Sequence, residues 1–189
     1  MLISLVGLPG SGKSTIGRRV ARDLAVPFFD SDLEVEREAG CSIASFFEQY
    51  GEPRFRDLEQ AVVARLTEAD DAVIATGGGA VLREANRAAL RQRSTVVYLD
   101  SPIAEILRRI GRVERRPLLA GEEKLEVKLN RLLTERDALY RQTAHLVVFT
   151  GRHSSAAAAG LVASRLREIR QEPQRPQWGS GGSNGSPRS

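Results

Sequence analysis

The sequence predicts an α/β domain in which helices cover both faces of a parallel β-sheet. Two observations predict it: five short apolar runs that resemble buried strands, and amphipathic stretches that separate each run from the next. Strands that alternate with helices pair in parallel, because each connection crosses back over the sheet. The chain has 189 residues, of which 41% are hydrophobic. One such domain with a buried core is therefore expected.

The five expected strands are short apolar runs without alternation, a pattern typical of strands buried on both faces. The first stops at Gly7, the second at Asp30, and the third at three consecutive glycines. Such breaks indicate loops at the carboxyl ends of the strands. In chain order, the expected strands are 2–6, 27–29, 72–75, 95–99 and 146–149.

The stretches between the strands carry apolar residues every three or four positions, which predicts amphipathic helices. Ile16, Val20 and Leu24 mark one face of the first helix. Pro102 stands where a helix begins, a position that tolerates its missing N–H group. In chain order, the expected helices are 13–24, 32–39, 42–50, 52–67, 84–93, 103–110, 123–140 and 155–170.

Composition excludes several classes of protein. No stretch approaches the 18 or so consecutive apolar residues of a transmembrane helix. The first residues lack the basic leader of a secretory signal, so we expect a cytoplasmic protein. The single cysteine, Cys41, excludes an intramolecular disulfide and a cysteine-built zinc site. Residues 171–189 change to Gly, Pro, Ser, Gln and Arg, which predicts a disordered tail after a domain at 1–170.

The basic residues favour small anionic ligands. The chain has 28 basic residues and a net charge of +4, and all but three of the basic residues are arginines. Guanidinium groups form planar, two-pronged hydrogen bonds with carboxylates and phosphates. Nucleic acid is the alternative partner, and a simple compositional bias toward arginine is a further one.

The most specific motif is GLPGSGKS at residues 7–14, which fits the phosphate-binding pattern G-x-x-x-x-G-K-[ST]. Its glycines let backbone N–H groups wrap around a phosphate, and the helix that follows adds the positive end of its dipole. Lys13 is expected to bridge the β- and γ-phosphates, and Ser14 to bind Mg²⁺. The motif predicts a nucleotide and leaves the reaction open.

Two further groups follow strands at the sheet edge where parallel sheets bind ligands. Asp30 and Asp32 follow the second strand, where one carboxylate could support Mg²⁺ and the other accept a proton. Helix capping by Asp30 or Ser31 is the alternative role. Gly77, Gly78 and Gly79 follow the third strand and could present N–H groups to a ligand, or form a flexible turn.

Two arginines stand apart from these motifs. Arg56 lies in an expected helix, where a solvated or ion-paired side chain is the usual role. Arg116 lies in the loop before the next helix, from which it could fold over phosphates during transfer, or belong to a surface cluster.

Together these residues resemble the shikimate kinase family. The resemblance runs from residue 2 to about residue 152 and covers most of the chain. It comprises the phosphate loop through Thr15 and five further groups in matching order. Those groups are Asp30-Ser31-Asp32, Phe55-Arg56 with Glu59, Gly77-Gly78-Gly79-Ala80-Val81, Arg116-Pro117-Leu118-Leu119, and Arg136 with Leu139-Tyr140.

The resemblance implies a P-loop kinase fold of the nucleoside-monophosphate-kinase type, with a mobile lid at about 112–122. It implies transfer of the γ-phosphate of ATP to the 3-hydroxyl of shikimate, with one Mg²⁺ per chain, in aromatic amino-acid biosynthesis. A monomer without nucleic-acid or membrane partners is expected.

The resemblance also implies residue roles. Asp32, Lys13 and Arg116 would be catalytic, and Ser14 and Asp30 would hold the metal. Shikimate would contact Asp32, Arg56, Gly78, Gly79 and Arg136. The nucleotide would contact Gly10, Ser11, Gly12, Lys13, Ser14, Thr15, Arg109, Arg116 and Arg152, with His153 as the alternative to Arg152 on the adenine side.

Two rival functions follow from the same residues. A related kinase of another small metabolite, such as gluconate, needs the phosphate loop and the aspartate but not two arginines beside three glycines. A nucleic-acid-binding ATPase would use the arginines, although the chain lacks the basic runs and interleaved aromatic residues expected of it.

Overall fold

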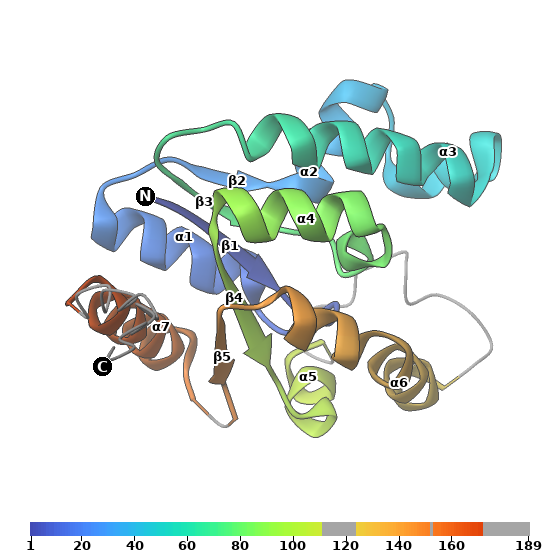
Figure 1. The fold of residues 1–189 in the computed structure, drawn as a ribbon. Helices are drawn as coiled ribbons and strands as arrows, with labels where there is room; N and C mark the ends of the chain where they lie inside the picture. Colours follow the sequence, from blue (N-terminus) through green and yellow to red (C-terminus); the bar gives the residue numbers. More distant parts are fainter. Residues whose placement is uncertain (111–123, 152, 172–189) are drawn as a thin grey trace, which may run out of the picture.

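The computed structural model describes residues 1–110, 124–151 and 153–171. In these ranges, five parallel strands form one sheet in the order β2-β3-β1-β4-β5 (Figure 1). The strands are β1 (Leu2–Val6), β2 (Phe28–Asp30), β3 (Ala72–Ala75), β4 (Thr95–Asp100) and β5 (Leu146–Phe149). The expected fold class and all five strands are confirmed, with bounds that shift by at most one residue.

Side chains that alternate along the strands divide the core into two faces. Ile3 and Leu5 pack with residues of α1 (Lys13–Leu24) and α7 (Ser155–Gln171). Val6 and Tyr98 pack on the other face against α4 (Glu84–Arg93), α5 (Ile103–Ile110) and α6 (Leu125–Thr143). Figure 1 shows these two helical layers on either side of the sheet. None of the described helices is long and apolar enough to cross a membrane.

The edge of the sheet at β2 carries two helices that form a third packed cluster. Helix α2 (Ser31–Ala39) follows β2 directly, and α3 (Ile43–Leu66) folds back over it. Val35, Ile43 and Phe55 join residues of β1 and β3 in this cluster. Gly51 has a φ of 75°, which interrupts α3 where the sequence predicts a break between two helices. The two expected helices therefore form one kinked element.

The other helices match expectation closely, and the differences have tertiary causes. A short 3₁₀ turn, η1 (Ala80–Leu82), was not predicted. Helix α6 ends at Thr143 instead of 140, because Arg91 of α4 donates hydrogen bonds to the carbonyl oxygens of Gln142, Thr143 and Ala144. A guanidinium group at a helix carboxyl end satisfies carbonyls that otherwise need water.

Two segments singled out by the sequence lie outside the described residues. They are the expected lid at about 112–122 and all but the first residue of the expected tail at 171–189.

The strand order positions the site. In the sheet, β2 and β3 lie on one side of β1, and β4 and β5 lie on the other side. The chain therefore reverses its direction of winding at β1. In open parallel sheets, ligands bind outside the carboxyl ends of the strands at such a reversal. The loop that follows β1 is the phosphate-binding motif, so the topology brings the motif to the predicted edge.

Candidate active site

The phosphate loop connects β1 to α1 and is shaped by glycines in the left-handed region. Gly10 has a φ of 81° and Gly12 a φ of 98°, conformations that are costly for residues with a Cβ. Lys13 begins α1, and its buried Nζ donates to the carbonyl oxygens of Gly7 at 2.8 Å and Leu8 at 2.9 Å. A lysine ammonium and a helix amino terminus therefore share one small loop, which favours a bound phosphate.

Asp30 connects the phosphate loop to the second strand. Its Oδ2 accepts a hydrogen bond from the Ser14 hydroxyl at 2.6 Å, and its Oδ1 accepts one from the backbone N–H of Asp32 at 3.2 Å. The second contact makes Asp30 the cap of α2. Both roles considered for this motif are therefore compatible. A hydroxyl and a carboxylate beside a phosphate loop fit Mg²⁺, which prefers oxygen ligands and binds few protein groups when phosphates are present.

The three glycines after β3 lie against side chains of the site. A Cβ on Gly77 would collide with the Asp32 carboxylate, and one on Gly78 would lie 2.8 Å from Pro9 Cδ. A Cβ on Gly79 would lie 2.5 Å from the Arg56 guanidinium. The three glycines are thus closely packed, and a Cβ at any of them would force a neighbouring group to move. The corner is also tied to α2, because the Gly77 N–H donates to Ser31 Oγ at 2.8 Å.

Arg56 projects from α3 and is held by two carboxylates. Its guanidinium contacts Glu59 at 2.6 Å and Glu52 at 3.1 Å, and Glu59 is only 1% exposed. Burial works to lower the pKa of Arg56, but the charges and hydrogen bonds of Glu59 and Glu52 together outweigh it, so the pKa is raised. Burial also raises the pKa of Glu59, although Arg56 opposes that shift. The ion-paired role expected of Arg56 is thus confirmed, and its guanidinium also reaches the pocket.

Arg136 projects from α6. Its Nη1 donates to the carbonyl oxygen of Gly78 at 3.1 Å. Its Nε is buried and has no hydrogen-bond partner among the described residues. Arg136 therefore reaches the glycine corner and keeps one buried donor that no described acceptor satisfies.

These side chains line one cavity of about 220 Å³, which we call the acceptor pocket. It brings together the expected Asp32, Arg56, Gly78, Gly79 and Arg136. Further lining residues were not assigned a substrate role from the sequence. They are Pro9, Ile43, Phe47, Glu52, Phe55, Glu59, Gly77, Lys128 and Leu132. Lys128, Leu132 and Arg136 recur at intervals of four on one face of α6, a spacing that could have indicated the first two.

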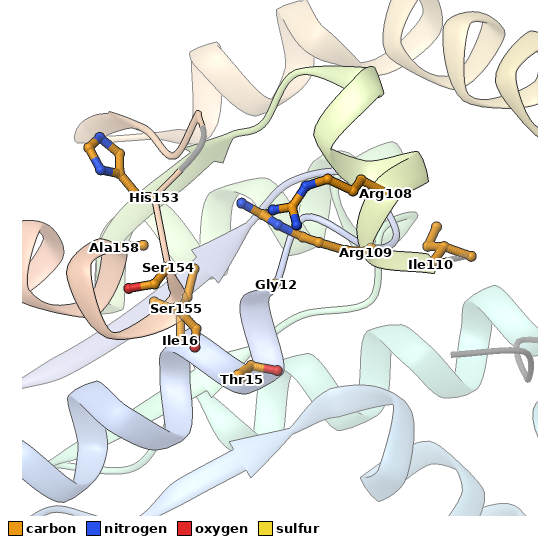
Figure 2. Close-up of a pocket in the computed structure, with 11 residues that line it drawn as sticks. Gly12, Thr15, Ile16, Arg108, Arg109, Ile110, His153, Ser154, Ser155 and Ala158 are labelled. Atoms are coloured by element: carbon orange, nitrogen blue, oxygen red, sulfur yellow. The ribbon is translucent and has the colours of Figure 1, made fainter. Parts of the chain in front are cut away.

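A second cavity of about 310 Å³, the donor cleft, is lined in part by the phosphate loop (Figure 2). It includes the expected Gly10, Gly12, Thr15 and Arg109. Figure 2 shows side chains that come from α1, from the end of α5 and from the start of α7. The remaining lining residues are Ile16, Arg108, Ile110, His153, Ser154, Ser155 and Ala158.

Arg109 holds the walls of the donor cleft together. Its Nη1 donates to the carbonyl oxygen of Ser11 at 3.1 Å, and its Nη2 donates to that of Gly151 at 3.2 Å. Ser101 also donates to the Ser11 carbonyl, at 3.2 Å, and sequence reasoning did not identify it. This serine follows β4 directly and carried no local motif.

The structure places one of three further nucleotide-side candidates. His153 lines the donor cleft, whereas Arg152, the other candidate on the adenine side, lies outside the described residues. Arg116 also lies outside them. The remaining expected residues surround the two cavities or the loop between them.

Comparisons with known proteins agree with this geometry. The shikimate kinase family model matches residues 9–167. The shikimate kinase of Paracidovorax citrulli is 51% identical over 158 residues, which are 82% of this chain and 86% of that protein. The one from Chromohalobacter salexigens is 47% identical over 167 residues, which are 88% of this chain and 92% of that protein.

Solved structures show the same likeness. Shikimate kinase from Acinetobacter baumannii in complex with shikimate superposes with a TM-score of 0.85 at 41% identity. That alignment covers 90% of this chain and 95% of the other. The enzyme from Aquifex aeolicus superposes with a TM-score of 0.77 at 34% identity, over 90% of this chain and 99% of that one. By sequence, fold and site geometry, the chain belongs to the shikimate kinase family.

Proposed function

We propose that this protein transfers the γ-phosphate of ATP to the 3-hydroxyl of shikimate, in the biosynthesis of aromatic amino acids. The observation that carries the proposal is the meeting of two cavities at the phosphate loop. Pro9 lines the acceptor pocket, and the next residue, Gly10, lines the donor cleft. A phosphate held by this loop would therefore face an acceptor molecule directly, as phosphoryl transfer requires.

The charge distribution of the acceptor pocket supports a hydroxylated carboxylic acid as the acceptor. Arg56 reaches it from α3 and Arg136 from α6, and paired guanidinium groups suit a carboxylate. Asp32 supplies carboxylate oxygens that accept hydrogen bonds from hydroxyl groups. Shikimate carries both kinds of group. The relative whose structure was solved with shikimate is 41% identical to this chain.

We assign the proton transfer to Asp32. Its carboxylate lies beside Gly77, in the pocket whose wall continues into the phosphate loop. There it would take the proton from the attacking hydroxyl while Lys13 and the amino terminus of α1 stabilise the charge on the transferring group. Arg116 is proposed to add a further positive charge. Because the transfer depends on positioning and charge, no strongly nucleophilic side chain is needed.

Ser14 and Asp30 are proposed to hold Mg²⁺, with Asp30 acting through water. When bound, the ion neutralises charge on the β- and γ-phosphates. The 2.6 Å contact between the two side chains supports this assignment, because it brings a hydroxyl and a carboxylate to one point beside the loop.

We also propose that the protein acts as a monomer in the cytoplasm. The requirement for ATP favours the cytoplasm. Light scattering after gel filtration measures the oligomeric state.

An ADP-release assay over a panel of hydroxy acids tests the function. We expect turnover with shikimate and none with gluconate. Turnover of another acid without shikimate would contradict the proposed substrate while leaving the kinase class in place. Filter binding of DNA and RNA at low salt tests the nucleic-acid rival, which predicts affinity that falls steeply with salt.

A further inference from the structure

A buried tyrosine contacts the glycine corner of the acceptor pocket from behind. Tyr140 lies on α6 and is fully buried. Its hydroxyl donates a hydrogen bond to the carbonyl oxygen of Gly78 at 2.5 Å. Arg136, one helical turn earlier, donates to the same oxygen at 3.1 Å. One carbonyl oxygen thus receives two donors from one face of α6, and neither donor is adjacent to it in the sequence.

The geometry of a peptide bond makes this contact relevant to the pocket. The carbonyl of Gly78 and the N–H of Gly79 belong to one planar unit and point in opposite directions. Fixing the carbonyl oxygen toward α6 therefore directs the Gly79 N–H away from that helix. Among the described residues, no backbone carbonyl accepts a hydrogen bond from this N–H. Gly79 lines the acceptor pocket and lies against the guanidinium of Arg56.

Tyr140 is built to remain a donor. Burial raises the pKa of its hydroxyl to about 12, although the charge of Arg136 opposes the shift. Its ring stacks on that of Tyr98, with 5.1 Å between the ring centroids. The ring position is therefore fixed independently of the hydroxyl, and the hydroxyl stays protonated near neutral pH.

We propose that Tyr140 is a positioning residue for the acceptor. Its hydrogen bond to Gly78 holds the Gly78–Gly79 peptide so that the Gly79 N–H and the Arg56 guanidinium face the same acceptor carboxylate. The bond also fixes the oxygen to which Arg136 is anchored. The inference rests on the proposed function, because it assumes an acceptor with a carboxylate.

The test is Tyr140→Phe, with Tyr98→Phe as its matched control. Tyr98 is equally buried and belongs to the same stacked pair, but its hydroxyl donates to Asp137 at 2.9 Å. Each variant keeps its ring and loses one phenol hydrogen bond. A lost hydrogen bond to a positioned group corresponds to about a tenfold change in an equilibrium constant. We expect Tyr140→Phe to raise KM for shikimate by about that factor, with KM for ATP unchanged.

The control separates positioning from stability. Tyr98→Phe should lower Tm as much as Tyr140→Phe does, yet leave KM for shikimate within about twofold of the parent. If Tyr140→Phe lowers Tm without moving KM for shikimate, the positioning role is wrong. If the parent protein does not phosphorylate shikimate at all, the proposed function fails first, and the two failures are thereby distinguished.

A measurement on the parent protein keeps the inference testable even if Tyr140→Phe does not fold. The amide resonance of Gly79 in a nitrogen–proton NMR spectrum should shift when shikimate is added, because its N–H gains an acceptor. The shift should be smaller in a folded Tyr140→Phe variant. A Gly79 resonance that shikimate leaves unmoved in the parent would overturn the inference.

Discussion

The phosphate loop and the acceptor pocket adjoin each other but are constructed differently. The phosphate loop is a single stretch at residues 7–14, and its backbone and one lysine form the binding surface. The acceptor pocket collects Asp32 from α2, Arg56 from α3 and Arg136 from α6 around the glycine corner. The part of the site that binds a common phosphate is thus local, whereas the part that selects the acceptor exists only after folding.

The two regions also hold their cations differently. Lys13 contacts backbone carbonyl oxygens within its own loop. Arg56 is held by side chains of Glu52 and Glu59, and Arg136 by the carbonyl of a distant corner. Loss of Lys13 should therefore reduce the rate of transfer, and changes to the arginines of the acceptor pocket should reduce affinity for one substrate. The following substitutions test this contrast.

Asp32→Asn should have the largest effect, because an amide cannot accept the proton of the attacking hydroxyl. General-base catalysis contributes about 10²–10⁴-fold, and we expect a loss of kcat in that range. KM for ATP should change little, because Asp32 lines the acceptor pocket and not the donor cleft. Steady-state kinetics with both substrates varied measure this. Asp57→Asn removes a surface partner of Arg83 and is the control. An equal loss of ATP affinity would contradict the assignment.

Lys13→Ala should come next, with a loss of kcat of about 10²–10³-fold, the usual cost of removing one preorganised donor. Circular dichroism should show an intact fold, because the hydrogen bonds of Lys13 to the carbonyl oxygens of Gly7 and Leu8 stay within one loop. Lys124→Ala, a change at an exposed lysine, is the control. Retention of near-parental kcat would disprove the role of Lys13 in transfer.

Arg136→Lys should act on the acceptor side alone. A lysine keeps the charge but cannot donate through a planar fork, so we expect KM for shikimate to rise about tenfold. Calorimetric titration with ATP should give parental affinity. Arg141→Lys on the same helix is the control, because Arg141 pairs with Asp137 and Asp100 outside both cavities. Parental shikimate affinity in Arg136→Lys would mean that this arginine does not bind the carboxylate.

Gly79→Ala should have a smaller effect of the same kind. The new Cβ would lie 2.5 Å from the Arg56 guanidinium, a movable side-chain end, so the fold should survive while the guanidinium shifts. We expect KM for shikimate to rise roughly threefold to tenfold, in line with modest overpacking. Gly160→Ala in α7 is the control, because a Cβ there meets nothing within 4 Å. The contrast fails if both variants behave alike.

The smallest expected effect is on the pH dependence of Tm, through a histidine beside β5. Nδ1 of His145, just before β5, accepts a hydrogen bond from the Val96 N–H at 3.0 Å. Burial and the charge of Arg91 hold the pKa of His145 below its ordinary 6.5. The unfolded chain therefore binds the proton more readily than the folded protein does. The neutral His145 thus contributes to folding stability above pH 6.5, and this contribution is lost as pH falls through the pKa of the folded state. His145→Gln should flatten the fall of Tm between about pH 7.5 and about pH 5.5. A parental slope in the variant would rule out His145 as the source.

The sequence predicted most of the fold because its signals are local. Apolar runs located all five strands, and periodic apolar positions located the helices of the described residues. The sequence did not predict the turn η1. It also missed the last residues of α6, because Arg91 of another helix caps that end. Tyr140 was visible only as part of a family-like string, and its contact with Gly78 spans 62 positions. No local pattern records such a contact.

By itself, the sequence determined the phosphate loop, because eight consecutive residues carry both the backbone shape and the charge that a phosphate needs. Tertiary structure alone decided how Asp32, Arg56, Arg136 and Tyr140 meet at three glycines. The physical reason is the distance along the sequence between the groups that recognise each ligand. A bound phosphate is recognised by neighbouring backbone groups, whereas a hydroxy acid is recognised by side chains whose directions are set only when distant helices pack on one sheet.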